Sequence, residues 1–220
     1  MSSFILKIIG IITMLLDHIG LVFYDESILR FIGRLAFPIF AFQASLGYEH
    51  TKNIKKYLLK LFIFAIISQI PYYLMTIDNG FHFNSIFTIF FGILSLVAYN
   101  KLDKLFDKIL AISLICILAT CLRVEYGIAG ILSIFFFNKF KDNKIISSIL
   151  FSLLFTLYYS LFIVFEKEII YNLFLLLGTL LSLIPINLYN GQEGKKLKYF
   201  FYIFYPLHML IIWLLSTIIK

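Results

Sequence analysis

An acid and an imidazole stand side by side in an otherwise apolar run. Asp17 and His18 lie in residues 14–24, MLLDHIGLVFY. An ionised residue near the centre of a bilayer costs about 2.5 to 3.5 kcal/mol, so it needs a partner and usually marks a function. Adjacent helical residues point about 100° apart, and the two side chains must therefore face different neighbours. A neutral imidazole can take a proton from a hydroxyl or an amine, which makes His18 a candidate general base.

Arg34 is the predicted partner of Asp17. Counting from the loop between the first two apolar segments, Asp17 lies about seven residues below it and Arg34 about four. The two opposite charges therefore share the outer third of the membrane. We predict that Asp17 pairs with Arg34 and that His18 is left free for chemistry. The alternative is a purely structural ion pair, with His18 hydrogen-bonded to the backbone.

Further polar side chains fall at a comparable depth in other apolar segments. Counting residues from the nearest loop gives the depth of each side chain in the membrane, and at this depth they could all face one cavity. These candidate site-lining residues are Gln69, Asn84, Thr88, Glu125 and His208. His208 lies alone on an aromatic segment and fits a structural role equally well. The sequence has no phosphate-cradling glycine loop, serine elbow, HExxH motif or cysteine pair at metal-ligand spacing, so no metal site is predicted.

The composition is that of an integral membrane protein. Hydrophobic residues make up 61% of the 220 residues and charged residues 14%, and the mean hydropathy is +0.96. Soluble domains contain only about 45 to 50% apolar residues. Apolar runs alternate with short polar breaks throughout, so we predict a single transmembrane domain over residues 1–220. No small-residue cleavage site follows the first run, and we expect it to remain as a helix.

The predicted fold class is all-α, a polytopic membrane helix bundle of about nine hydrophobic segments. A transmembrane helix needs about 20 apolar residues. Full-length helices are predicted at residues 4–24, 31–48, 58–76, 85–100, 145–165, 169–189 and 199–219. Two shorter runs, 109–122 and 126–137, flank Arg123 and Glu125 and form either two short spans or a re-entrant hairpin. All four prolines fall inside these segments, where proline kinks a helix.

Lysines gather in alternate loops. They are Lys52, Lys55 and Lys56, then Lys101, Lys104 and Lys108, then Lys139, Lys141 and Lys144, and lastly Lys195, Lys196 and Lys198. Cytoplasmic loops of membrane proteins carry an excess of Lys and Arg, so the amino terminus is predicted inside and the carboxyl terminus outside. This topology accounts for the net charge of +7 with the lipid bilayer as partner and no nucleic acid.

Six stretches carry a family resemblance that runs almost end to end. They are MLLDHIG, GRLAFPIFAF, KKYLLKLFIFAIISQIPY, NSIFTIFFG, EYGIAGIL and LKYFFYIFYPLHMLIIWLL. Together they resemble the TraX family, membrane proteins linked to amino-terminal acetylation of conjugative pilin. The resemblance implies an integral protein of the bacterial plasma membrane. Glu125 stands where the family is expected to carry Asp, which keeps the charge but moves the carboxylate.

The resemblance implies an acetyl-CoA-dependent transmembrane acetyltransferase. The family is similar to a wider group of acyltransferases that move acetyl from cytosolic acetyl-CoA to an amine or hydroxyl of a peptide or saccharide acceptor. In that group a histidine on an early helix is taken to be catalytic. If this role is transferred to the matching motif of this sequence, His18 is the base or acetyl carrier, and Asp17 and Arg34 shape the site. His208 of the YPLH motif becomes a second candidate, and Tyr205 of that motif a site-lining residue.

The implied acyl donor, acetyl-CoA, is an anion with a long arm. Its phosphates are expected to rest on lysines of two cytoplasmic loops, while Arg34 or Asn84 stabilises the oxyanion. The candidate cofactor-binding residues are Lys52, Lys55, Lys56, Lys195, Lys196 and Lys198. The positive-inside topology alone also explains these lysines.

Two other function classes fit the same residues. Buried charges and kinked helices also suit a proton-coupled transporter. A non-enzymatic assembly factor of a pilus or secretion system would need neither the base nor the thioester. Direct transfer and an acetyl-histidine intermediate both remain open for the enzyme, and the sequence carries no signal for an oligomeric state.

Overall fold

The chain is helical throughout the part described by this computed structural model, which covers residues 1–24, 28–77, 80–166, 168–195 and 198–219. These residues form eleven helices and no strand, apart from one isolated β-bridge between Phe83 and Val124. The helices are α1 (Ser3–Phe23), α2 (Ile28–Gly33), α3 (Ala36–His50), α4 (Ile54–Met75), α5 (Ser85–Lys101), α6 (Leu105–Cys121), α7 (Gly127–Lys139), α8 (Lys144–Glu166), α9 (Ile169–Leu181), α10 (Leu183–Asn187) and α11 (Lys198–Ile219).

All nine predicted hydrophobic segments are helical, but the second and the eighth are each broken in two. The breaks separate α2 from α3 and α9 from α10. Pro38 and Pro185 are the third residues of α3 and α10, in a first turn where a backbone N–H has no helical acceptor. The prediction that all four prolines lie inside helices is confirmed; Pro71 and Pro206 lie in helix interiors, whereas Pro38 and Pro185 lie in first turns, where proline removes no helical hydrogen bond.

The helices have the length and surface of an integral membrane protein. Five stretches are long and apolar enough to cross a membrane: Ser3–Phe23, Ile28–His50, Ile54–Met75, Lys144–Val164 and Ile169–Asn187. Three shorter helical stretches, Ser85–Lys101, Gly127–Lys139 and Ile203–Ile219, are also apolar. Many large apolar side chains face outward, with Ile70 69% and Ile170 86% exposed, whereas Asp17, His18 and Arg34 are buried. Apolar outside and polar inside is the arrangement that a bilayer requires.

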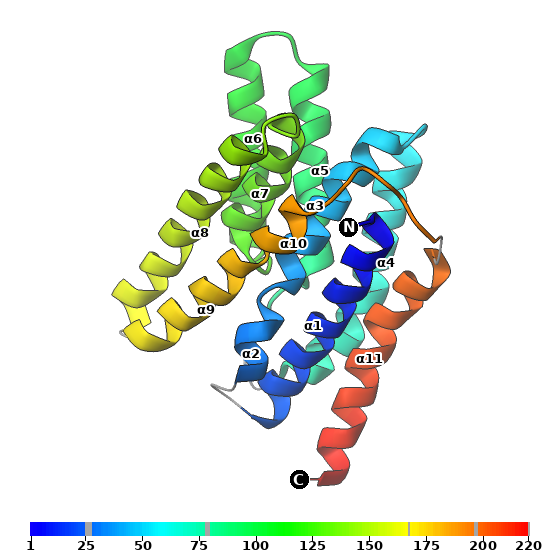
Figure 1. The fold of residues 1–220 in the computed structure, drawn as a ribbon, viewed down its shortest axis with the longest axis vertical. Helices are drawn as coiled ribbons and strands as arrows, with labels where there is room; N and C mark the ends of the chain where they lie inside the picture. Colours follow the sequence, from blue (N-terminus) through cyan, green and yellow to red (C-terminus); the bar gives the residue numbers. More distant parts are fainter. Residues whose placement is uncertain (25–27, 78–79, 167, 196–197, 220) are drawn as a thin grey trace.

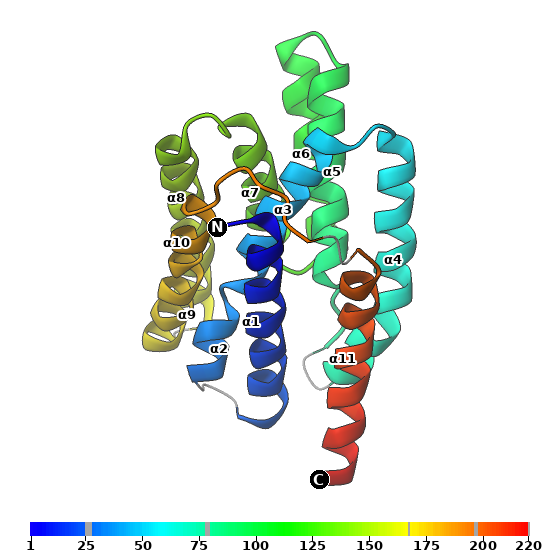
Figure 2. The same cartoon turned by 45° about the vertical axis from the view of Figure 1, so that its right-hand side comes forward.

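The amino terminus lies toward the end of the bundle that carries the lysines. We call this the lysine-rich end; it holds the connections α3–α4, α5–α6, α7–α8 and α10–α11 (Figure 1). The Ser3 and Phe4 backbone N–H groups donate to the carbonyls of Gln192 (2.8 Å) and Glu193 (3.0 Å), which ties the start of α1 to the α10–α11 connection. The carboxyl terminus lies at the opposite end, and α11 stands beside α1 and α4, away from α8 and α9 (Figures 1 and 2).

The two short segments, α6 and α7, form a hairpin whose tip ends inside the bundle. At the tip, Phe83 donates its N–H to the Arg123 carbonyl (3.2 Å) and accepts from the Glu125 N–H (2.9 Å). The next residue, Asn84, donates its side-chain amide to the carbonyl of Ala65, in the middle of α4 (2.9 Å). Gln69, one turn further along α4, also bonds the Asn84 N–H and the His82 carbonyl, so the tip lies about six to ten residues, or roughly 9 to 15 Å, short of the far end of α4. This geometry favours the re-entrant alternative.

Candidate active site

Asp17 is buried between two guanidinium groups. Its Oδ1 accepts hydrogen bonds from Nε (3.2 Å) and Nη2 (2.6 Å) of Arg34, and its Oδ2 lies 2.5 Å from Arg34 Nη2 and 2.9 Å from Arg30 Nη1. The predicted pairing of Asp17 with Arg34 is confirmed, and Arg30 is a second partner that the sequence reasoning missed. A Cβ added at Gly33 would lie 2.3 Å from the Asp17 Cβ, so α1 and α2 can approach this closely only because that residue is glycine.

His18 points away from this ion cluster and toward α11. Its Nδ1 lies 2.7 Å from Nε2 of His208, and the two rings are nearly parallel, with an interplanar angle of 6°. His18, predicted to be left free for chemistry, thus has one ring nitrogen engaged by His208. Nδ1 of His208 in turn lies 2.8 Å from the carbonyl oxygen of Phe204, one turn earlier in α11. The two neighbouring residues of the opening motif thus contact different helices, as their separation of about 100° around α1 allows.

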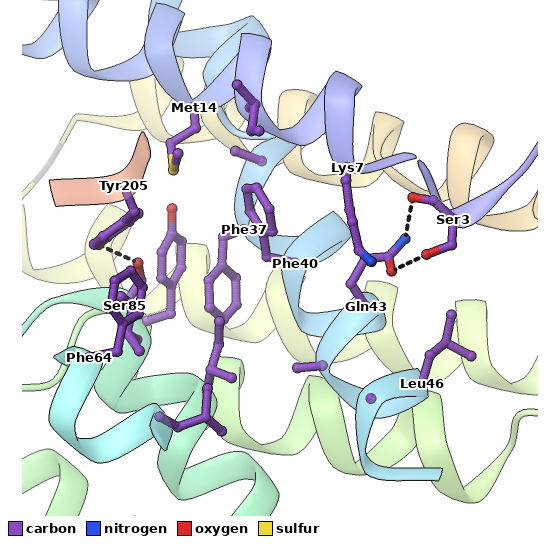
Figure 3. Close-up of a pocket in the computed structure, with 18 of the residues that line it drawn as sticks. Ser3, Lys7, Met14, Phe37, Phe40, Gln43, Leu46, Phe64, Ser85 and Tyr205 are labelled. Carbon is purple, nitrogen blue, oxygen red and sulfur yellow. Dashed lines mark hydrogen bonds between the residues drawn. The ribbon is translucent and has the colours of Figure 1, made fainter. Parts of the chain in front are cut away.

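A cavity of about 500 Å³, the first cavity, connects His18 with the lysine-rich end. Its inner end is lined by Asp17, His18, Ser85, Glu125, Tyr126 and Tyr205. Its outer part is lined by Ser3, Lys7, Gln43, His50, Glu193 and Lys195. Figure 3 shows Tyr205 and Ser85 near one end of this cavity and Lys7, Gln43 and Ser3 near the other. Lys7 and His18 are eleven residues apart on α1, or about 16 Å along the helix.

Comparison with known proteins identifies the family. The family model described as TraX protein matches residues 2–216. This chain belongs to the TraX family. A probable fimbrial assembly protein, FimC, of Dichelobacter nodosus is 28% identical over 229 residues, which cover 94% of this chain and 93% of that relative. An uncharacterized protein of Rickettsia prowazekii (strain Madrid E) is 42% identical over 67 residues, 30% of this chain and 25% of that relative. No solved structure matches.

Four of the predicted catalytic and site-lining residues of this TraX chain line the first cavity: Asp17, His18, Glu125 and Tyr205. Arg34 and His208 lie one layer behind, where they contact Asp17 and His18 respectively. The Tyr205 hydroxyl lies 3.0 Å from the Ser85 hydroxyl, so two hydroxyl groups stand together at the inner end. Ser85 was missed because a serine at the start of a helix is an ordinary capping residue in sequence.

Gln69, Asn84 and Thr88 were expected to face the cavity, but they lie outside its lining. Gln69 accepts from both the backbone N–H (3.0 Å) and the side-chain amide (2.9 Å) of Asn84. The Asn84 side chain also accepts from the Ile86 N–H (3.0 Å) and so caps α5. The Thr88 hydroxyl donates to the carbonyl of Glu125. These residues attach the α6–α7 turn, and with it Glu125, to α4 and α5.

Of the four predicted cofactor-binding lysines whose side chains the structure describes, three lie away from the cavity. Lys52, Lys55 and Lys56 are exposed and are not among its lining residues, whereas Lys195 is. Lys196 and the side chain of Lys198 lie outside the described residues. Lys7 lines the cavity and was missed.

The sequence does contain a signal for Lys7. With Ile11, Met14 and His18 it forms a series at spacings of four, three and four residues, and all four line the cavity. This spacing places the series on one face of α1.

A second cavity, of about 660 Å³, lies on the other side of the α6–α7 turn. Glu125 and Tyr126 line both cavities. The rest of its lining includes Tyr72, His82, Thr120, Arg123 and the α8 residues Leu154, Leu157, Tyr158, Leu161 and Phe162. Arg123 and Tyr126 have positive φ angles of 50° and 61°, a conformation that is costly for side chains other than glycine. The partition between the two cavities is therefore a strained turn.

Proposed function

We propose that this protein is a membrane acetyltransferase that moves acetyl from cytosolic acetyl-CoA to an acceptor at or across the membrane. The observation that carries the proposal is the first cavity, which joins the buried imidazole of His18 to cations at the lysine-rich end. Coenzyme A has a long arm that ends in phosphates. A cavity with a base at its inner end and Lys7 and Lys195 toward its mouth suits such a donor. The lysine-rich end would then face the cytoplasm of a bacterium.

In this mechanism His18 acts as a general base. Its ring takes the proton from the acceptor nitrogen or oxygen as that atom attacks the thioester carbonyl. The C–S bond then breaks, and the same proton passes from His18 to the departing sulfur, so that free coenzyme A leaves as a thiol. An acetyl-histidine intermediate remains the alternative route.

The oxyanion of the tetrahedral intermediate needs donors that reach the cavity. Arg34 was one candidate, but its Nε and Nη2 are engaged by Asp17, and neither Arg34 nor Asn84 lines the cavity. The hydroxyls of Ser85 and Tyr205 do line the inner end, and we assign the oxyanion to this pair. The ion cluster of Asp17, Arg30 and Arg34 then fixes the position of α1, and with it the position of His18.

The acceptor is proposed to approach through the second cavity. Glu125 lines both cavities, and its carboxylate would attract the protonated form of an amine. A relative described as a probable fimbrial assembly protein supports a pilin-like peptide amine, as does the pilin acetylation that the resemblance to the TraX family implies. A saccharide hydroxyl is the alternative acceptor.

The direct test is acetyl transfer by the purified protein in lipid nanodiscs, with radiolabelled acetyl-CoA and a pilin-like peptide. His18→Ala is expected to abolish transfer and to leave coenzyme A binding near the wild-type value. Lys104→Ala is the matched control, because this exposed lysine of the α5–α6 connection lies outside the cavity lining and is not among the candidate cofactor-binding lysines. Undiminished acetylation by His18→Ala would exclude the proposed base.

A proton-coupled transporter is the second candidate, since two cavities separated by one strained turn also resemble an alternating-access site. Consumption of acetyl-CoA by the purified protein separates the enzyme from the transporter. A non-enzymatic assembly factor would neither bind coenzyme A nor be stabilised by it.

A further inference from the structure

We propose that His208 is a positioning residue that fixes the tautomer of His18, so that His18 Nε2 holds the lone pair that receives the acceptor's proton. The proposal rests on the proposed role of His18 as the base. It assigns to α11 a function in the reaction, although His208 does not line the first cavity.

The direction of the hydrogen bonds follows from the chemistry of the groups. A carbonyl oxygen can only accept, so the 2.8 Å contact between His208 Nδ1 and the Phe204 carbonyl places a proton on Nδ1 of His208. A neutral imidazole carries one N–H, and Nε2 of His208 is then an acceptor. His18 Nδ1, 2.7 Å away, must therefore be the donor. Nε2 of a neutral His18 is left unprotonated.

The environment of the pair favours two neutral rings. His18 is 8% exposed and His208 is 4% exposed, so a charge on either would be poorly solvated. The neighbouring carboxylate of Asp17 is already engaged by Arg30 and Arg34. If both rings were fully protonated, two N–H groups would point at each other across 2.7 Å, which is repulsive.

Aromatic side chains of α11 hold the His208 ring in the orientation that this donation requires. The Phe204 ring stacks on it, with centroids 4.8 Å apart and an angle of 9°. Tyr205 packs edge-on at 5.9 Å and 67°. Residues three and four apart share one helix face, so Phe204, Tyr205 and His208 form a local unit of α11. The His18 ring lies within 6° of the His208 plane, which aligns its N–H with the acceptor lone pair.

The hydrogen bond from His18 Nδ1 to His208 Nε2 becomes stronger while His18 holds the acceptor's proton. As His18 takes a proton on Nε2, its Nδ1–H becomes part of an imidazolium, and a charge-assisted hydrogen bond is roughly twice as strong as a neutral one. His208 gains and loses no proton in the cycle. It stabilises the charged state of His18 that exists only while the acceptor attacks.

Two substitutions separate this role from simple packing. Gln can place its Oε1 near the position of the imidazole Nε2 and still accept, whereas Phe keeps a flat ring but has no acceptor. We expect His208→Phe to lower kcat about 10- to 100-fold, the equivalent of one hydrogen bond to a charged group, with KM for acetyl-CoA unchanged. His208→Gln should recover most of kcat. Leu207→Phe, at an exposed position of the same helix, is the matched control and should keep wild-type kcat.

A second measurement does not depend on activity. Nitrogen NMR of ¹⁵N-histidine-labelled protein in nanodiscs distinguishes protonated from unprotonated ring nitrogens. We expect a wild-type His18 signal with Nδ1 protonated and Nε2 unprotonated, and a shift toward the other tautomer in His208→Phe.

A wild-type His18 protonated at Nε2, or a His208→Gln protein as impaired as His208→Phe, would overturn the proposal. The expected tautomer in a protein that transfers no acetyl would instead refute the proposed function and leave the hydrogen-bond direction standing.

Discussion

The buried carboxylate of Asp17 offers the sharpest test of what holds the first helices together. Asp17→Asn keeps the size of the side chain but removes the negative charge between Arg30 and Arg34. The carboxylate now makes four contacts with the two guanidinium groups at 2.5 to 3.2 Å. In the amide, one oxygen becomes an NH₂ group that faces other donors.

The expected loss of folding free energy follows from the burial of the Asp17 ion pairs. Removing one partner of a buried ion pair costs about 3 to 5 kcal/mol, because the remaining charge is left uncompensated in a poorly solvated site. Two guanidiniums remain here, so we expect Asp17→Asn to reach this range. Removing both partners should cost less than the sum of the single changes, and Asp17→Asn with Arg34→Leu should show a coupling energy of about 2 kcal/mol or more.

Reversible denaturation of the detergent-solubilised protein measures these free energies of unfolding. Asp103→Asn is the control: this exposed carboxylate lies in the α5–α6 connection, and its loss should change stability by no more than about 0.5 kcal/mol. If Asp17→Asn unfolds at the same denaturant concentration as Asp103→Asn, the ion cluster does not hold α1 to α2 and the reasoning fails.

Three further variants test the site and its surroundings. Gly33→Ala would bring a Cβ to 2.3 Å from the Cβ of Asp17, so α1 and α2 must separate; we expect thermal denaturation to show a loss of about 1 to 3 kcal/mol, and an unchanged midpoint would contradict this close packing. Glu125→Gln should lower the rate of transfer to an amine about 10- to 100-fold in steady-state assays but spare a hydroxyl acceptor, and equal losses for both would argue against an ammonium contact. Lys141→Ala removes a half-exposed ion pair with Glu49, at 2.5 Å, and should cost less than about 1 kcal/mol in denaturant titrations, whereas a larger loss would mean that the pair is desolvated.

Sequence reasoning was most successful for features that depend on one segment or on two consecutive segments. The nine hydrophobic segments follow from apolar length alone, since a bilayer requires helices of a fixed reach. The Asp17–Arg34 pair follows from opposite charges at equal depth on two consecutive segments. Arg30 was missed because it was counted as part of the loop, whereas α2 begins at Ile28 and carries it to the carboxylate.

Contacts between segments that are distant in sequence could not be predicted from apolar length and depth in the membrane. Depth counting places His208 near the middle of the last segment, but depth says nothing about which helices are neighbours in the plane of the membrane. His18 and His208 are 190 residues apart in sequence and meet only because α11 packs beside α1. Which loop lysines reach the cavity could not be predicted for the same reason: of the four candidate cofactor-binding lysines whose side chains are described, Lys195 lines it and Lys52, Lys55 and Lys56 do not. Positive charge in a loop reports the side of the membrane, whereas contact with the cavity depends on how the loop folds over its mouth.

The join between the start of α1 and the α10–α11 connection has a consequence for biosynthesis. Ser3 bonds to Gln192 and Phe4 to Glu193, so one border of the cavity mouth is made from residues that leave the ribosome far apart in time. At about 5 to 20 residues per second, roughly 10 to 40 s separate their synthesis. During that interval the nascent helices can already be inserted while the mouth stays unfinished, and the lining of the cavity is complete only after α11, which carries Tyr205, has also emerged.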